Sequence, residues 1–256
     1  MRQRFIQSFS TSGDVQTAID GGQLGKPYVV YLEDEERIDW NSKEVTPPLS
    51  ALPLTFEIIS ADTITWKCED NPIFPAPSCT IEYSINDGPW SSITSTFEGV
   101  SFQVNNGDKV KFSGDNNNYS GRLAQAGNTL LVNGTFKLYG NIASLIHSTG
   151  YTSVSRINGV SHFFKGNTGL TEVTEIAFGV NSDVSFGAYA LTELFSECTS
   201  LAKIKCLLEP YPGREITSDW LNGVSPTGTF VKHPDATWSS GPNGIPDGWT
   251  VEDADI

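Results

Sequence analysis

Hydrophobic and polar residues alternate with a period of two along residues 54–113. The alternating runs are LTFEIIS (54–60), TITWK (63–67), TIEYSI (80–85), VSFQV (100–104) and KVKF (109–112). Asn-Asp-Gly at 86–88 and Asn-Asn-Gly at 105–107 have the composition of tight turns. Five or six short strands between turns favour a small immunoglobulin-like β-sandwich over residues 54–119.

A longer pattern occurs twice in the second half of the chain. FFKGNTGLTEVTEIAF begins at Phe163, and LFSECTSLAKIKCLL begins at Leu194. At an offset of 31 residues the matched positions are Phe164 and Phe195, Thr168 and Thr199, Leu170 and Leu201, Val173 and Ile204, and Ile176 and Leu207. Such self-similarity indicates stacked repeats. The repeat core is predicted to contain Phe164, Leu170, Val173, Phe195, Cys198, Leu201 and Ile204.

Cys198 lies opposite Asn167 in this frame, at a turn where leucine-rich repeats place a side chain that satisfies backbone groups. We therefore interpret Cys198 as a structural residue, not a nucleophile. Two repeats are too few to stack unaided, so the flanks are expected to cap them. Residues 128–147 are predicted to form a strand pair and a short helix. Residues 219–251 should close the far end with three tryptophans, Trp220, Trp238 and Trp249.

Residues 1–46 read as a separate segment that is too small for a core of its own. Ser12 is a plausible N-cap for a short helix, and the runs at 28–32 and 37–40 are strand-like. Large side chains suited to an interface are Tyr28, Tyr31, Ile38 and Trp40. Residues 47–53, with three prolines, are expected to be a semi-stiff linker.

Composition excludes several classes of protein. Charged residues make up 18% and hydrophobic residues 38%, which is typical of a folded chain, and the formal net charge is −14. An acidic chain repels a phosphate backbone, so no nucleic-acid partner is expected. The N-terminal sequence MRQRFIQSFSTSGDVQ has no apolar run suited to a signal peptide, and no stretch reaches membrane-span length. We expect no membrane insertion, and a protein that stays where it is made or leaves within a larger particle.

Residues with catalytic or metal-binding potential form no recognisable motif. The four cysteines, Cys68, Cys79, Cys198 and Cys206, have no metal-ligand spacing; reduced packing cysteines are expected, although Cys68 and Cys79 could meet across paired strands. His147, His162 and His233 are isolated in the sequence, and His162 is interpreted as a packed or surface histidine. Two convergent carboxylates of a glycoside hydrolase remain an open alternative. We predict no catalytic, cofactor-binding or metal-binding residue, and hence no enzyme.

The C-terminal half resembles the BspA-like leucine-rich repeat family of gut Bacteroidetes and their phages. The residues that carry this resemblance are LFSECTSLAKIKCL and the closing NGVSPTGTFVKHPDATWSSGPNGIPDGWTV. The segments IEYSINDGPW and VNNGDKVKFSGDNNNYSG resemble the β-domain that commonly precedes these repeats. VQTAIDGGQLGKPYVVYLEDEERIDWN resembles the opening of head-fibre and other appendage proteins of crAss-like and related Bacteroides phages.

The resemblance implies a mainly β multidomain protein with an N-terminal docking segment (1–46), a linker (47–53), an immunoglobulin-like β-sandwich (54–119) and a short BspA-like leucine-rich-repeat domain with a C-terminal cap (120–256). It implies a structural virion protein at the particle surface: a head fibre or similar capsid decoration, made in the bacterial host cytoplasm. Residues 1–46 are expected to bind capsid or other virion proteins and to form a dimer or trimer. The projecting domains are expected to engage host-surface glycans or mucus. The alternatives are a bacterial cell-surface adhesin and a glycan-degrading enzyme.

Overall fold

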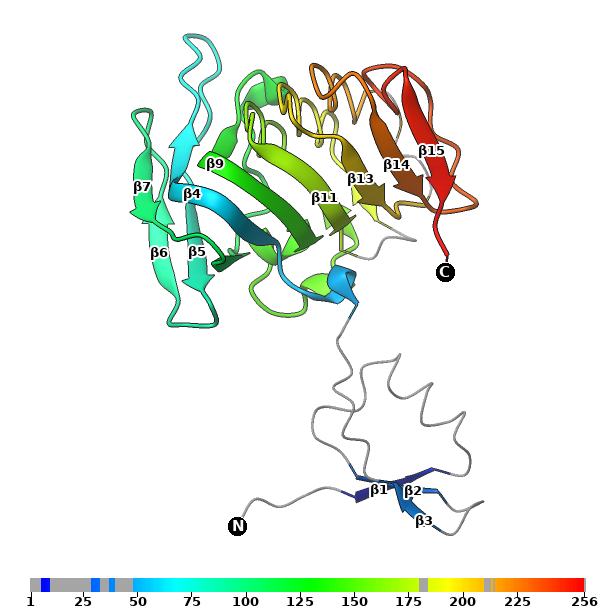
Figure 1. Ribbon diagram of the computed structural model, residues 1–256. Coiled ribbons are helices and arrows are strands. Elements are labelled where there is room, and N and C mark those ends of the chain that lie inside the picture. Colours follow the sequence, from blue (N-terminus) through cyan, green and yellow to red (C-terminus); the bar gives the residue numbers. More distant parts are fainter. Residues whose placement is uncertain are drawn as a thin grey trace. The chain divides into compact units, whose positions relative to one another are not determined.

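The computed structural model describes residues 48–179, 184–209, 213 and 215–255, together with the backbone of three short strands nearer the N-terminus. The chain divides into two compact units, residues 1–48 and residues 49–256 (Figure 1). Among the described residues no helix is long and apolar enough to cross a membrane.

The N-terminal unit contains a three-stranded sheet in the order β1-β2-β3. Strand β1 (Ile6–Phe9) pairs in parallel with β2 (Val29–Leu32), and β2 pairs antiparallel with β3 (Arg37–Asp39). The strand-like runs at 28–32 and 37–40 therefore contain two strands that pair with each other. The helix expected after Ser12 lies outside the described residues.

Residues 49–256 form one ten-stranded mixed sheet, which confirms the expectation of a mainly β protein. The first part consists of β4 (Thr55–Cys68), β5 (Thr80–Ile85), β6 (Ser91–Thr94), β7 (Val100–Gln103) and β8 (Lys109–Ser113). The second part consists of β9 (Asn128–Asn141), β11 (Leu170–Ala177), β13 (Lys203–Cys206), β14 (Gly228–Lys232) and β15 (Trp249–Asp253). A separate two-stranded sheet pairs β10 (Arg156–Ile157) with β12 (Ser185–Phe186). The described residues of this unit also form short 3-10 helices: η1 (Leu49–Ala51), η2 (Arg122–Ala124), η3 (Ile142–Leu145) and η4 (Tyr151–Ser153).

Strand β4 joins the two parts of the sheet. It pairs antiparallel with β7 and β8 of the first part and with β9 of the second. The runs at 54–60 and 63–67 were expected to be separate strands, but they form this single strand, with register shifts near Ala61. Gly134 of β9 makes the close approach possible, because a Cβ there would meet Ser60 O at 2.0 Å. Likewise, residues 128–141 form one long strand and not the strand pair expected.

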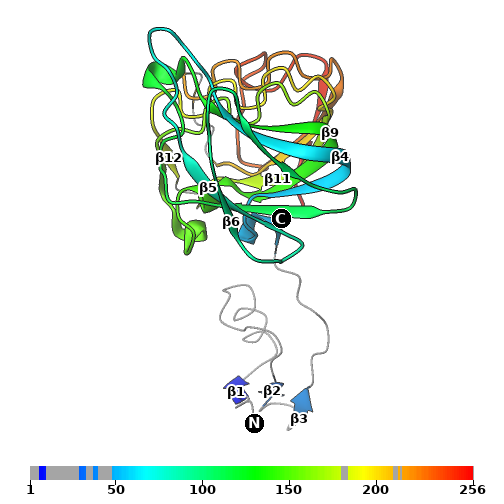
Figure 2. The ribbon, with the colours of Figure 1, turned by 90° about the vertical axis from the view of Figure 1, so that its left-hand side faces the viewer.

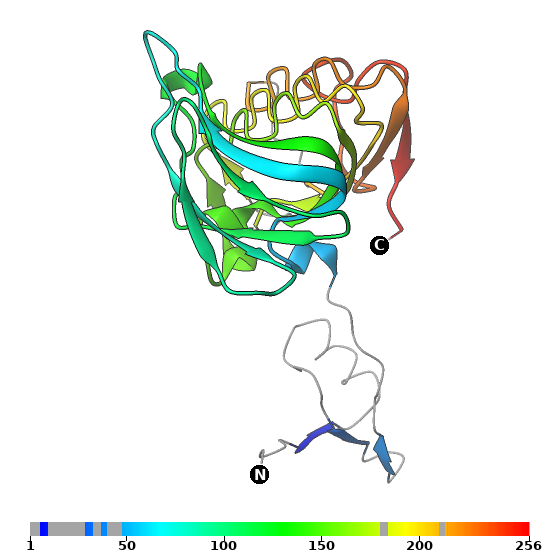
Figure 3. The same ribbon diagram turned by 60° about the vertical axis from the view of Figure 1, so that its left-hand side comes forward.

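The five strands of the second part run parallel to one another, in the order β9, β11, β13, β14 and β15. Each strand belongs to one coil, meaning one turn of a solenoid-like stack. Turn segments on the side away from the strands follow one another as a row of loops (Figure 3). Backbone bonds link successive turns, such as those from Phe164 N to Leu194 O at 3.0 Å and from Phe195 N to Trp220 O at 2.8 Å. Each coil therefore hydrogen-bonds to its neighbour at the turns as well as along the strands.

The sheet register confirms the 31-residue repeat at its centre. Val173 pairs with Ile204, and the rings of Phe164 and Phe195 are stacked with centroids 5.1 Å apart. The match of Ile176 with Leu207 is wrong, because a register shift after Val173 pairs Ile176 with Cys206.

One buried core runs from the first part of the sheet to the last coil. It includes Trp66 of β4, Phe112 of β8, Phe136 of β9 and Phe230 of β14. Strands β5 and β6 lie at one end of the stack (Figure 2). The sequence predicted two separate domains, at 54–119 and 120–256. In the structure both segments instead contribute strands to one sheet and side chains to one core.

The proline-rich segment packs against this unit from residue 49 onward, so it is not a free spacer there. Helix η1 lies beside β9 and β11, and Ser50 N donates to the buried carboxylate of Glu175 at 3.1 Å. Tyr151 donates its hydroxyl to Ala51 O at 3.0 Å.

The far end of the stack is closed by aromatic residues, as the sequence predicts. Trp220 is fully buried, stacks on Trp238 with centroids 5.1 Å apart, and donates its indole N–H to Gly244 O. Trp249, in the terminal strand, donates its indole N–H to Ser225 O at 2.8 Å.

Candidate functional site

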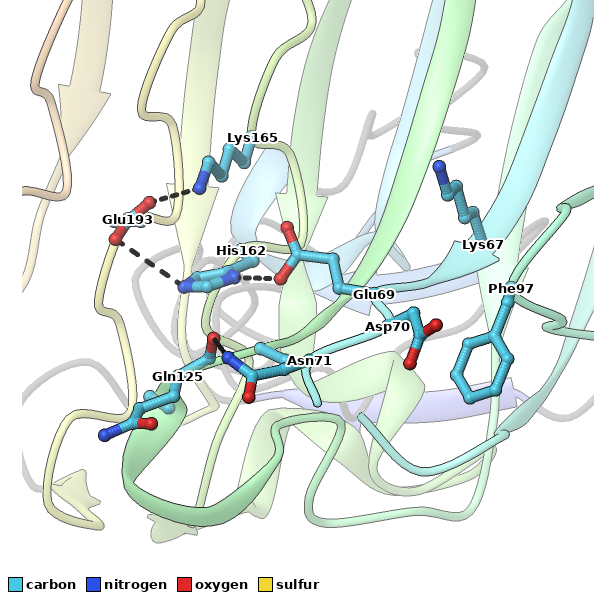
Figure 4. Close-up of a pocket in the computed structure, with 11 residues that line it drawn as sticks. Lys67, Glu69, Asp70, Asn71, Phe97, Gln125, His162, Lys165 and Glu193 are labelled. Carbon is cyan, nitrogen blue, oxygen red and sulfur yellow. Dashed lines mark hydrogen bonds and ion pairs between the residues drawn. The ribbon is translucent and has the colours of Figure 1, made fainter. Parts of the chain in front are cut away.

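A pocket of about 470 Å³ lies where the end of β4 meets the row of turns. One wall comes from the end of β4, the residues after it and the turn that carries Phe97; the other walls come from residues 124–126 and from two successive turns. Figure 4 shows Asp70 and Phe97 on one side, with Glu193 and Lys165 on the opposite side.

Four charged or polar side chains form a connected chain across this pocket. Glu69 Oε2 lies 2.5 Å from His162 Nδ1, His162 Nε2 lies 3.9 Å from Glu193 Oε1, and Glu193 Oε2 lies 2.5 Å from Lys165 Nζ (Figure 4). His162 is 3% exposed, whereas the other three side chains are partly exposed. The buried ring therefore links two carboxylates that both reach the pocket.

The ionisation of this chain follows from its contacts. Burial alone would raise the pKa of Glu69, but the hydrogen bond and charge of His162 and the N–H of Gly127 lower it below its usual value. Burial would lower the pKa of Lys165, but its hydrogen bond and ion pair with Glu193 raise it. Both groups are therefore held in their charged forms near neutral pH.

The tautomer of His162 is set by Glu69. A carboxylate only accepts hydrogen bonds, so the Nδ1 facing it carries the proton, and in a neutral ring Nε2 is left as an acceptor. Among the described residues, this buried Nε2 has no hydrogen-bond partner. Buried polar atoms are rarely left unsatisfied, so an unpaired one at a pocket wall needs an explanation.

Local backbone structure holds the histidine in place. The backbone of His162 has a φ of +64°. Its N–H donates to Thr192 O, and its carbonyl oxygen accepts from the Thr129 hydroxyl. Gly127 must be glycine here, because a Cβ would lie 2.6 Å from His162 Cβ. The Gly127 N–H in turn donates to Glu69 Oε2 at 2.8 Å, so one close backbone approach positions both partners.

The opposite wall is fixed by two turns. Asn71 Oδ1 accepts from the N–H groups of Ile73 and Phe74, and its amide donates to Gln125 O at 3.3 Å. The turn that carries Phe97 is pinned to β4 by the bond from Cys68 N to Thr96 O at 3.0 Å. Phe97 is 45% exposed on this rigid support.

No protein-family model, curated protein or solved structure matches the chain. The site is therefore interpreted from its geometry alone.

The structure places the predicted repeat-core residues in the interior. All of them are fully buried, namely Phe164, Leu170, Val173, Phe195, Cys198, Leu201 and Ile204. Asn167 Oδ1 accepts from Val132 N, and its amide donates to Leu130 O and Phe164 O. Cys198 Sγ lies 3.1 Å from the same Phe164 O, and burial raises the pKa of its thiol to about 12. Such a thiol stays protonated near neutral pH, as a structural role requires.

All four cysteines lie within the described residues, and each is a buried free thiol. Burial raises the pKa of Cys79 to about 11 and that of Cys206 to about 12.

The predicted interface residues are only partly within the described chain. Tyr31 of β2 is the register partner of Ile38 of β3. Tyr28 and Trp40 lie outside the described residues, as do the side chains of Tyr31 and Ile38.

One group outside the pocket has metal-ligating side chains. Glu209, His233 and Asp235 have ligand atoms within 4.8 Å of one another. However, His233 Nδ1 accepts the N–H of Asp235 at 3.2 Å, and its Nε2 lies 3.5 Å from Glu209 Oε2. A neutral ring that accepts at Nδ1 carries its proton on Nε2, where it points to the carboxylate. The histidine thus has a partner for each ring nitrogen within the chain.

Sequence reasoning missed the pocket residues other than His162. The missed residues are the adjacent Glu69 and Asp70, with Phe97 and Glu193 farther along the chain, and they match no motif. His162 was interpreted as a packed or surface histidine, and the structure buries it. Its link to Glu69 depends on the pairing of β4 with β9, which no local pattern encodes.

Proposed function

We propose that the protein is a structural and binding protein of a phage virion: a head fibre or similar capsid-surface appendage. In this proposal residues 1–48 attach the chain to capsid or other virion proteins and bring copies together as a dimer or trimer. Residues 49–256 project from the particle and bind the host surface.

The observation that carries this proposal is the division of the chain into a small unit and a large one. The large unit has a main core that extends from the first part of the sheet to the last coil, which suits a body that must project without bending. It also has a preformed polar pocket fixed by backbone bonds. The small unit supplies a three-stranded sheet, which is the part of the chain proposed to dock on the particle.

Glycan cleavage is a second candidate, because Glu69 and Glu193 both line the pocket on either side of His162. A glycoside hydrolase needs one carboxyl group that is protonated at working pH. The lowered pKa of Glu69 argues against that residue as such a group, and the carboxylate of Glu193 is occupied by its ion pair with Lys165. We therefore favour binding without cleavage.

Deletion of residues 1–48 tests the proposed roles. The remaining chain should be soluble and melt cooperatively, because residues 49–256 form a compact unit with an extensive buried core. It should be absent from assembled particles, whereas the full-length chain is incorporated. Incorporation of the truncated chain at the normal copy number would refute the assignment of attachment to residues 1–48.

A further inference from the structure

The pocket combines three features that together point to one class of ligand. It contains a buried ring nitrogen that has no hydrogen-bond partner among the described residues (His162 Nε2), a partly exposed aromatic ring (Phe97), and several charged groups of both signs. Among the described residues, Lys67 and Asp70 form no ion pair, so their hydrogen-bonding capacity is available to a ligand.

We propose that this pocket binds a neutral saccharide, with sugar hydroxyls hydrogen-bonded to the Glu69–His162–Glu193–Lys165 chain and to Asp70, and with the C–H face of a sugar ring packed on Phe97. This binding rests on the proposed function, in which residues 49–256 face the host surface.

Hydroxyl groups fit the polar part of the pocket because each can both donate and accept. The carboxylates of Glu69, Asp70 and Glu193 need donors. A hydroxyl can also bond to the unpartnered His162 Nε2, as donor to a bare nitrogen or as acceptor from an N–H. Lys67 donates to hydroxyl oxygens. A ring with hydroxyls around its edge satisfies donors and acceptors together, which a purely apolar ligand cannot do.

The aromatic ring meets the other part of such a ligand. Phe97 is 45% exposed, although its backbone is pinned by the bond from Cys68 N to Thr96 O, so the ring is presented without a large ordering cost. Burial of apolar C–H surface on this ring would add to the hydrogen bonds.

Competing ligands fit less well. Three carboxylates and two lysines line the pocket, so a phosphate, sulfate or sialic-acid group would meet net negative charge. A metal ion at His162 Nε2 and Glu193 would lie close to the ammonium of Lys165, which is 2.5 Å from Glu193 Oε2.

Binding of the full-length chain to immobilised oligosaccharides tests the proposal. The probes are neutral oligosaccharides of hexoses and N-acetylhexosamines, with sialylated and sulfated counterparts, followed by titration calorimetry on the best neutral probe. Phe97→Ala is expected to weaken binding at least about fivefold, and Asp70→Ala several-fold. Both residues are on the surface, so neither change should unfold the protein.

Two matched controls use residues outside the pocket. Trp90→Ala removes a ring that is 49% exposed, and Glu98→Gln removes an exposed carboxylate next to Phe97. Neither should change the affinity. Absence of binding to every neutral probe, preference for the acidic probes, or equal affinity of Phe97→Ala and Trp90→Ala would overturn the proposal.

The experiments distinguish failure of the saccharide site from failure of the proposed function. If the chain binds no neutral probe but residues 1–48 are still required for incorporation into particles, the pocket assignment is wrong and the structural role remains. If the truncated chain is incorporated while Phe97→Ala abolishes binding, the saccharide site remains and the attachment role is wrong.

Discussion

Asn167 offers the sharpest test of the stacked-coil architecture, because one side chain satisfies two backbone groups of the preceding strand. Its Oδ1 accepts from Val132 N at 2.9 Å, and its amide donates to Leu130 O at 2.7 Å. Leu130 is fully buried and Val132 is 9% exposed, so water cannot readily replace these bonds. Asn167→Ala leaves a buried N–H and a buried C=O unsatisfied, at about 1–3 kcal/mol each. The unfolding free energy should therefore fall by roughly 2–6 kcal/mol.

Cys198→Ala is the matched comparison at the equivalent position of the next coil. Its thiol contacts Phe164 O, which also accepts from the Asn167 amide at 2.9 Å, so no backbone group is orphaned. The expected loss is about 1 kcal/mol, the value of one buried methylene-sized group.

Urea unfolding followed by tryptophan fluorescence measures both variants, since every tryptophan except Trp40 lies in residues 49–256. With a slope of about 2–3 kcal/mol per M, Asn167→Ala should lower the midpoint by roughly 1–2 M. A loss below about 1 kcal/mol for Asn167→Ala, or equal losses for the two variants, would refute the proposed role of this turn residue.

Three further predictions follow from the core and the sheet surface. Leu201→Ala removes a fully buried side chain of the repeat and should cost about 2–5 kcal/mol in the same unfolding assay; a negligible cost would mean that Leu201 is not a stacking residue. Thiol titration of the denatured protein should give four free thiols, and a disulfide between Cys68 and Cys79 would contradict this. Burial would raise the pKa of Glu172, but its bonds with two lysines lower it below its usual value. The contribution of Glu172 to the unfolding free energy is therefore present above about pH 4.5 and is lost as the pH falls through the folded-state pKa. Stability of Glu172→Gln should therefore fall less on acidification than that of the exposed control Glu252→Gln, and parallel pH profiles would exclude this role.

The sequence predicted those features that depend on repeated side chains. Val173 and Ile204 were matched correctly because both occupy the same inward position of consecutive coils. Ile176 was matched incorrectly because a register shift changes the pairing without any change in hydrophobic pattern. The aromatic closure by Trp220 was likewise predictable from large apolar residues among turn residues.

Long-range pairing was not predictable in the same way. Alternation shows that a strand has a buried face, but it does not specify which strand lies beside it. The pairing of β4 with β9 therefore could not be deduced from the sequence. Because this pairing joins residues 54–119 to residues 120–256 in one sheet, that joining could not be predicted either. The pocket depends on this pairing, because it brings Glu69 to His162 across 93 positions of sequence.

Adsorption of phage particles to host cells tests the central claim most directly. Particles would be assembled with full-length chain carrying either Phe97→Ala or Trp90→Ala, and the copy number would be measured in each. At equal copy number, Phe97→Ala particles should adsorb more weakly than unmodified particles, while Trp90→Ala particles should adsorb normally. Equal adsorption of all three would contradict the claim that residues 49–256 bind the host surface through this pocket.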